Sequence, residues 1–238
     1  MQTKLKRRDF IKRTIGITAA AGIGGCGFML NGCRSEPPYD LIIRRGLIYD
    51  GSGQNPYRAD IGIRGGKIAE IGKISASHAK SVIDAQDLAV CPGFIDVHNH
   101  TGVELFVNPN AEGAIRQGIT TIISGNCGGS PFPVAVDMID DFRDSVKAEF
   151  GIEADWTNIG GFLSKLEANG TSVNYATLIG HGSVRGAVVG YNNRPSKQDE
   201  IEKMKHLVEE SMKAGAFGIS TGLVYPPGCF AQAEEIIE

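Results

Sequence analysis

The sequence predicts an α/β fold in two parts: a small, mostly antiparallel β domain over residues 39–91, then the first half of a parallel (β/α)8 barrel over residues 92–238. Three observations predict it. Short β-branched runs separated by turn residues come first, short apolar runs without strict alternation follow, and helical stretches lie between the later runs. Strands buried on both faces give such unalternated runs, and strands that alternate with helices indicate a parallel sheet.

The first 33 residues have the pattern of an export signal. Residues 6–12 read KRRDFIK, a twin-arginine pattern, and residues 15–30 are uncharged but too short and glycine-rich for a membrane span. Residues 30–33 read LNGC, which resembles a lipobox, where cleavage leaves Cys33 lipidated. We expect export by the twin-arginine route to the periplasm or cell surface with a lipid anchor on Cys33, or else retention as an uncleaved anchor.

Composition limits the partners of the remaining chain. The net charge is −3 over 238 residues and 42% of residues are hydrophobic, so a globular domain with a core is expected. The chain is not basic enough for a nucleic-acid-binding protein. We expect a small-molecule partner, and membrane contact only through the lipid anchor. The 5 cysteines do not form a disulfide framework pattern.

Short strands separated by turn residues predict the β domain. The expected strands cover residues 40–49, 60–64, 67–72, 81–84 and 88–90. Gly65-Gly66, between the second and third, is a two-residue hairpin signal. Together these runs predict a small, mostly antiparallel sheet.

The barrel is predicted from four buried strands and the helices between them. The expected strands cover residues 94–97, 119–124, 175–179 and 217–220. The clearest helix covers residues 197–214, with Ser196 as its N-cap and Gly215 as its C-terminal stop. Four strands make half of a barrel that takes roughly 250 residues in full. Residues 231–238 read AQAEEIIE, the start of a helix without a stop signal, so we expect the sequence to be truncated.

Distinctive polar residues follow these strands at the end where barrel enzymes carry their chemistry. The first strand continues into His98 and His100, and side chains at i and i+2 of an extended chain point the same way. A bare HxH pair is a weak signal. Directly after an apolar strand that is preceded by Pro92-Gly93, it predicts that both imidazoles bind one metal ion.

Cys127 follows the second strand in the stretch SGNCGGS. A lone cysteine there is open to four interpretations. It is a buried core thiol, half of a disulfide with Cys91 or Cys229, a nucleophile, or a metal ligand.

Four stretches, CPGFIDVHNH, ITTIISGNCGGS, LIGHGSVR and GAFGISTGLVYPP, occur in this order. The chain from residue 39 onward thereby resembles the N-acyl-D-amino-acid deacylases (D-aminoacylases) of the amidohydrolase superfamily, over the first half of that family's length. The resemblance implies a metal-dependent barrel. It implies that His98 and His100 form one metal subsite and that Cys127 binds the tighter Zn²⁺, with a second, weaker zinc as an open question. The fourth strand lacks the bridging lysine of many relatives, and a thiolate offers the anion that the site needs. Under this resemblance, the glycines next to Cys127 would allow the backbone to approach a crowded ion closely.

The function implied by this resemblance is zinc-dependent hydrolysis of the amide bond of N-acyl-D-amino acids, which are small acylated substrates. Tyr225 is implied as a substrate contact. The catalytic aspartate and two further zinc histidines are expected beyond residue 238, so this stretch alone is expected to be inactive. His181 and Arg185 are expected to be structural, and Asp96 to orient its neighbours by hydrogen bonds.

One departure from the family pattern leaves alternatives open. The family often has acidic residues directly after its histidine pair, as in HTHDD, whereas residues 98–104 here read HNHTGVE, with Glu104 as the possible substitute. The alternatives are a cyclic-amide or dipeptide hydrolase of the same superfamily and a non-catalytic surface lipoprotein on a decayed barrel.

Overall fold

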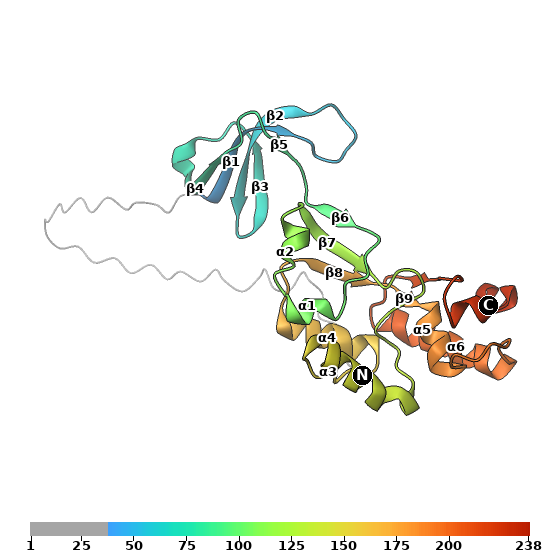
Figure 1. Cartoon of the computed structure of the whole chain (residues 1–238). Coiled ribbons are helices and arrows are strands. Elements are labelled where there is room, and N and C mark those ends of the chain that lie inside the picture. The colour runs from blue at the N-terminus through green and yellow to red at the C-terminus, as the bar shows by residue number, and fades with distance from the viewer. Residues whose placement is uncertain (1–37) are drawn as a thin grey trace, which may run out of the picture. The chain divides into compact units, whose positions relative to one another are not determined.

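The computed structural model describes residues 38–238, which fall into two compact units (Figure 1). Residues 38–45 and 59–84 belong to the first unit, and residues 46–58 and 85–238 to the second. The predicted export signal and the lipidated Cys33 lie outside the described residues. Within the described range, every helix is too short or too polar to cross a lipid bilayer.

A five-stranded sheet is built from β1 (Tyr39–Ile48), β2 (Tyr57–Arg64), β3 (Lys67–Gly72), β4 (Ala79–Asp84) and β5 (Ala89–Val90). Its order is β3-β2-β1-β4, and β5 also pairs with β1. The predicted hairpin is confirmed: β2 and β3 are antiparallel, and Gly65 and Gly66 turn between them with φ of +57° and +71°. Glycine adopts such left-handed angles without steric cost.

The sheet is mixed where a mostly antiparallel sheet was predicted: β2 and β3 are antiparallel, but β1 pairs in parallel with both β4 and β5. Parallel neighbours need a crossover connection. Here the β2–β3 hairpin and a 3-10 turn at Ala76–His78 supply it, so the chain returns beside β1 in the same direction. Turn signals in the sequence indicate where the chain reverses its direction, but not which strands that are distant in sequence pair with each other.

The second unit contains the strands β6 (Phe94–Asp96), β7 (Ile119–Ser124), β8 (Asn174–Thr177), β9 (Ile179–Gly180) and β10 (Ile219–Ser220). The pairs β6–β7, β7–β8 and β9–β10 are all parallel, as predicted. Backbone bonds from Leu178 N to Ser124 O (2.9 Å) and from Phe217 N to Thr177 O (2.8 Å) continue the ladder between them. Because β8 and β9 follow each other along one segment around Leu178, the described strands form four neighbouring parallel segments in chain order, without closing into a barrel.

The expectation that these strands are buried on both faces fails at the two ends of the array. Phe94 in β6 is 56% exposed and Ile219 in β10 is 50% exposed, whereas Ile122 in β7 is 2% exposed. Strands β6 and β10 each have a neighbour on one side only among the described residues. Their apolar side chains therefore remain uncovered.

Seven α-helices connect or flank these strands: α1 (Glu104–Val107), α2 (Glu112–Ile115), α3 (Ile139–Phe150), α4 (Ile159–Asn169), α5 (His181–Val188), α6 (Gln198–Lys213) and α7 (Ala233–Ile237), counted over residues 38–238. The helix α6 and its stop at Gly215 were predicted, but Ser196 is not its N-cap. The cap is Lys197, whose backbone N–H donates to Glu200 Oε2 at 2.8 Å. The Ser196 hydroxyl is bonded to a buried carboxylate instead.

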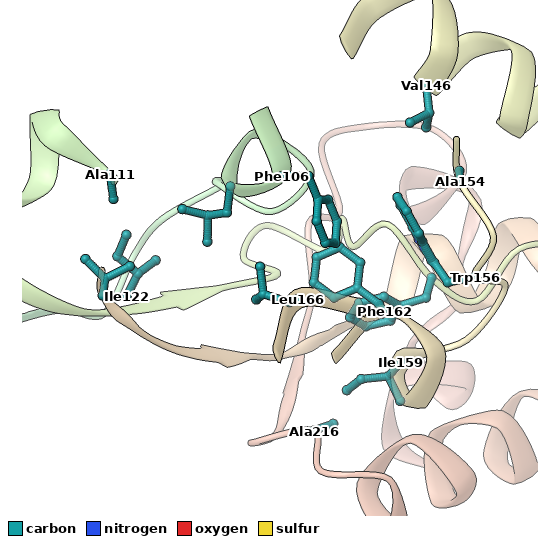
Figure 2. Packing of buried hydrophobic residues seen from close by; sticks show 13 residues of the cluster. Phe106, Ala111, Ile122, Val146, Ala154, Trp156, Ile159, Phe162, Leu166 and Ala216 are labelled. Atoms are coloured by element: carbon teal, nitrogen blue, oxygen red, sulfur yellow. The ribbon is translucent and has the colours of Figure 1, made fainter. Parts of the chain in front are cut away.

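An aromatic cluster packs beside β7 and β8 and forms the centre of the larger core (Figure 2). The rings of Phe106, Trp156 and Phe162 lie with their centroids 5.2–5.4 Å apart. The indole Nε1 of Trp156 donates to Pro131 O at 3.1 Å, so its polar atom is satisfied inside the core. This packing fixes α1 and α4 beside the strands whose ends carry the site described next.

Replacing Asn158 by alanine tests how α4 begins. Asn158 is the N-cap, and its Oδ1 accepts a hydrogen bond from Gly161 N at 2.9 Å. Loss of this acceptor leaves a helix N–H without its partner, so Asn158→Ala is expected to lower the free energy of unfolding by about 1 kcal/mol. Urea denaturation measures it. Asn158→Asp keeps the acceptor and serves as the control; equal losses in both variants would contradict the capping role.

Candidate metal centre

The structure brings His98, His100 and Cys127 together at the carboxyl ends of β6 and β7. One potential ligand atom from each of the three lies within 4.8 Å of the other two. Cys127 Sγ is 3.3 Å from His98 Nε2, and the two imidazole centroids are 5.5 Å apart. Both histidines are exposed and the cysteine is half-buried, so a bound ion would remain accessible to a substrate.

The loop after β6 is held by side-chain hydrogen bonds. The carboxylate of Asp96 accepts from His98 N at 3.2 Å and from Asn99 Nδ2 at 2.7 Å. From the next loop, Asn126 Nδ2 donates to Asn99 O at 3.2 Å. Asp96 thus orients its neighbours as predicted, and Asn126 ties the histidine loop to the cysteine loop.

The backbone at Cys127 has an unusual conformation. Its φ is +55°, in the left-handed region that residues other than glycine rarely adopt. Gly125 and Gly128 on either side also have positive φ, +77° and +75°. Such local strain persists only where the surroundings impose it, and it is common at binding sites.

The glycines of this region bring backbone segments together, whereas the sequence suggested that they make room for an ion. A Cβ on Gly128 would lie 2.6 Å from Gly222 N, and a Cβ on Gly222 would lie 1.9 Å from Cys127 O. The Ser220 hydroxyl joins the same segments, accepting from Gly128 N at 3.0 Å. The loop after β10 therefore packs directly against the cysteine loop, and this contact sets the position of Cys127.

Gly222→Ala should displace the cysteine loop. The added methyl group would overlap the Cys127 carbonyl, so we expect a loss of roughly 1–3 kcal/mol in stability together with weaker zinc binding. Gly129→Ala is the matched control, since the nearest atom to its new Cβ is Asn126 O at 3.9 Å. Urea denaturation and zinc titration measure both effects. Equal behaviour of the two variants would show that the close approach at Gly222 does not position Cys127.

Tyr225 lies on the loop after β10 and is 58% exposed. It lines the same cavity as His100 and Cys127. Glu104, considered as a substitute acidic residue, instead accepts a hydrogen bond from Gly102 N at 2.8 Å at the start of α1 and is outside the cluster. The described cysteines Cys91, Cys127 and Cys229 are all free thiols, so no disulfide forms among them.

His181 and Arg185 belong to a buried ion-pair network that the sequence did not reveal. Their partner is Glu235 of α7: His181 Nε2 lies 2.8 Å from its Oε1, and Arg185 Nη1 pairs with its Oε2. The Arg185 side chain is 0% exposed and that of Glu235 3%. Ser196 also bonds to this carboxylate. The network joins α5 to α7 and so anchors the chain segment that follows Tyr225.

The donor set in the cluster suits zinc. Two imidazoles and one thiolate are nitrogen and sulfur ligands of the kind that Zn²⁺ prefers. Hard cations such as Mg²⁺ and Ca²⁺ take oxygen ligands instead.

A family model described as "Amidohydrolase family" matches residues 81–236. The chain belongs to the amidohydrolase family. This amidohydrolase is 38% identical to a D-aminoacylase of Alcaligenes xylosoxydans xylosoxydans over 208 residues, which are 84% of the chain and 41% of that protein. It is 36% identical to an N-acyl-D-aspartate deacylase of the same organism, over 84% of the chain and 40% of that protein.

Solved structures agree with this assignment. An N-acyl-D-glutamate deacylase from Bordetella bronchiseptica, solved with zinc and a phosphonate inhibitor, has a TM-score of 0.74 and 35% identity over 83% of the amidohydrolase chain and 41% of its own. A D-aminoacylase structure that was solved to study the functional role of its binuclear metal center has a TM-score of 0.74 and 37% identity. The match covers 84% of the amidohydrolase chain and 42% of that D-aminoacylase. The chain spans less than half the length of these relatives.

Proposed function

We propose that this amidohydrolase cleaves the amide bond of N-acyl-D-amino acids at a zinc centre to which His98 and His100 contribute one subsite and Cys127 contributes a ligand of the tighter zinc. The observation that carries the proposal is the convergence of the three ligand atoms within 4.8 Å. Sequence identity of 36–38% to a D-aminoacylase, an N-acyl-D-aspartate deacylase and an N-acyl-D-glutamate deacylase supports the substrate class.

Each described residue has a distinct role in this proposal. A zinc ion bound at these residues would supply a lowered pKa for a water molecule and polarisation of an amide carbonyl. Asp96 and Asn126 hold the two ligand loops in register through the hydrogen bonds described above. The phenol hydroxyl of Tyr225 has no hydrogen-bond partner within residues 38–238, so it is free to donate to a substrate carbonyl or carboxylate oxygen.

Hydrolysis by the intact, zinc-loaded protein tests the proposal. We expect release of free amino acid from N-acetyl-D-amino acids, slower release from the L-isomers, and loss of activity with a chelator that zinc restores. Faster turnover of hydantoins or dipeptides would favour a cyclic-amide or dipeptide hydrolase, and zinc binding without any turnover would favour a non-catalytic lipoprotein. Zinc titration would show one tight site, and a second transition would reveal a weaker one.

We also propose twin-arginine export and a lipid anchor on Cys33, supported by the KRRDFIK and LNGC stretches. Labelling of growing cells with a fatty acid should mark the wild-type protein but not Cys33→Ala. An unlabelled wild-type protein would contradict the lipid anchor.

A further inference from the structure

The cavity beside Cys127 has a wall of apolar rings. Four tyrosine and proline side chains line it, here called the ring wall: Tyr191, Tyr225, Pro226 and Pro227. The other lining residues are His100, Asn126, Cys127, Gly128, Gly129, Gly182, Ser183, Gly222 and Gly228. Within residues 38–238, no lysine, arginine, aspartate or glutamate lines this cavity.

Two polar side chains of the cavity, those of Asn126 and Ser183, already form hydrogen bonds within the protein. Asn126 Nδ2 donates to Ile123 O at 2.9 Å and to Asn99 O at 3.2 Å. Ser183 Oγ donates to Ser130 O and accepts from Ser130 N, both at 2.8 Å. An occupant that is remote from the metal ligands therefore meets glycine backbone, the ring wall and its two phenol hydroxyls.

Tyr191 extends this wall from the loop after α5. It is 65% exposed, so an occupant of the cavity would cover much of its surface. A Cβ on Gly186 would lie 3.7 Å from Tyr191 Cε2 and 3.9 Å from Pro227 Cγ. The two rings thus approach the same glycine, and the wall is continuous between α5 and the loop that follows β10.

We infer that the ring wall binds a neutral, apolar group of the substrate and that Tyr191 determines which N-acyl amino acids are hydrolysed fastest. This inference rests on the proposed deacylase function. A charged group that contacts the ring wall away from the metal ligands would lose hydration without meeting a lysine or arginine of the described lining, and burying an unpaired charge is strongly unfavourable. The first turn of α5 also faces the cavity and favours anions, but Ser183 N is already bonded to Gly128 O at 3.2 Å.

The apolar group has two possible sources, the amino-acid side chain or the acyl chain, and four substrates separate them. Values of kcat/KM are measured for N-acetyl-D-alanine, N-acetyl-D-leucine, N-hexanoyl-D-alanine and N-acetyl-D-glutamate with the intact, zinc-loaded protein. We expect kcat/KM for either N-acetyl-D-leucine or N-hexanoyl-D-alanine to exceed that for N-acetyl-D-alanine by at least about tenfold. The value for N-acetyl-D-glutamate should not exceed that for N-acetyl-D-alanine. Whichever of the two is preferred identifies the group that the wall binds.

Substitution of Tyr191 then tests whether this residue determines the substrate preference. Tyr191→Ala should remove most of the preference, and Tyr191→Phe should retain it because the ring remains. Tyr49→Ala, at another exposed tyrosine, should change neither rate nor preference. A preference for glutamate, or an unchanged preference in Tyr191→Ala, would overturn the inference while leaving the deacylase function intact. A wild-type protein that hydrolyses none of the four would overturn the proposed function, and this inference with it.

Discussion

Replacing Cys127 by serine is expected to weaken zinc binding more than about 100-fold and to abolish amide hydrolysis. Loss of a residue that merely orients a metal ligand costs about 10–100-fold in affinity or activity, and Cys127 is proposed to be a ligand itself. A thiolate is a soft anion that zinc prefers, whereas a serine hydroxyl stays protonated and is a poor ligand. The tighter zinc subsite would then lose the ligand that this stretch of the chain supplies to it.

Zinc content after dialysis and competition with a chromophoric chelator measure the affinity, and release of free amino acid measures the activity. Cys91→Ser is the matched control, because Cys91 is also a free thiol but is exposed and outside the cluster. Both variants should unfold at the same urea concentration as the wild type once zinc is removed from all three. Full zinc content and full activity in Cys127→Ser would refute the proposed ligand set.

The sequence was sufficient to predict that the three metal-cluster residues converge, because their positions depend on which strand each one follows and on how parallel strands are arranged. The stretches that contain His98, His100 and Cys127 each follow an apolar strand, and parallel strands present their carboxyl ends at one edge. The bounds of β7, residues 119–124, match the prediction. Strand type, strand order and the side of the sheet together were sufficient to bring the three residues together.

The positive φ of Cys127 could not be predicted in this way. Its conformation depends on the contact between Gly222 and the Cys127 carbonyl, which joins two loops far apart in the chain. The same limit applies to the small sheet, where the parallel return of β4 beside β1 is a property of the whole connection. Propensities and turn signals describe neighbours in sequence, and these features arise from neighbours in space.

Glu235 shows the limit most clearly. In AQAEEIIE nothing distinguishes Glu235 from Glu234, and both begin the same short helix. The distinction comes from Arg185, 50 residues earlier, which pairs with Glu235 in the interior while Glu234 remains exposed. Ser196 illustrates the same point, since its hydroxyl bonds to Glu235 and not to the start of α6.

Glu235→Ala is expected to lower the free energy of unfolding by roughly 3–5 kcal/mol, the usual cost of removing one partner from a buried ion pair. The variant leaves the guanidinium of Arg185, 0% exposed, without its carboxylate. The remaining bonds of that guanidinium, to Ser196 Oγ at 2.7 Å and to Arg194 O at 2.6 Å, are to neutral groups and do not neutralise its charge.

Urea denaturation measures this loss, and the neighbouring residue provides the control. Glu234→Ala removes a carboxylate from the same turn of α7, but an exposed one, so its effect should stay within about 0.5 kcal/mol. Glu235→Gln keeps the shape and some hydrogen bonds while removing the charge, and should fall between the two. Similar losses for the substitutions at 234 and 235 would mean that the buried network does not hold α7 in place.

The effect of Glu235 should also depend on pH with a defined sign. Burial by itself raises the pKa of this carboxyl, but hydrogen bonds from Ser196, Arg185 and His181 outweigh it and hold the pKa below its ordinary value of 4.5. A group whose pKa is lowered on folding contributes its full stabilisation above the unfolded value and loses it as the pH falls through the folded value. The difference in unfolding free energy between wild type and Glu235→Gln should therefore be constant near neutral pH and shrink as the pH falls below 4.5. A difference that does not change with pH would show that the charge of Glu235 is not what stabilises the network.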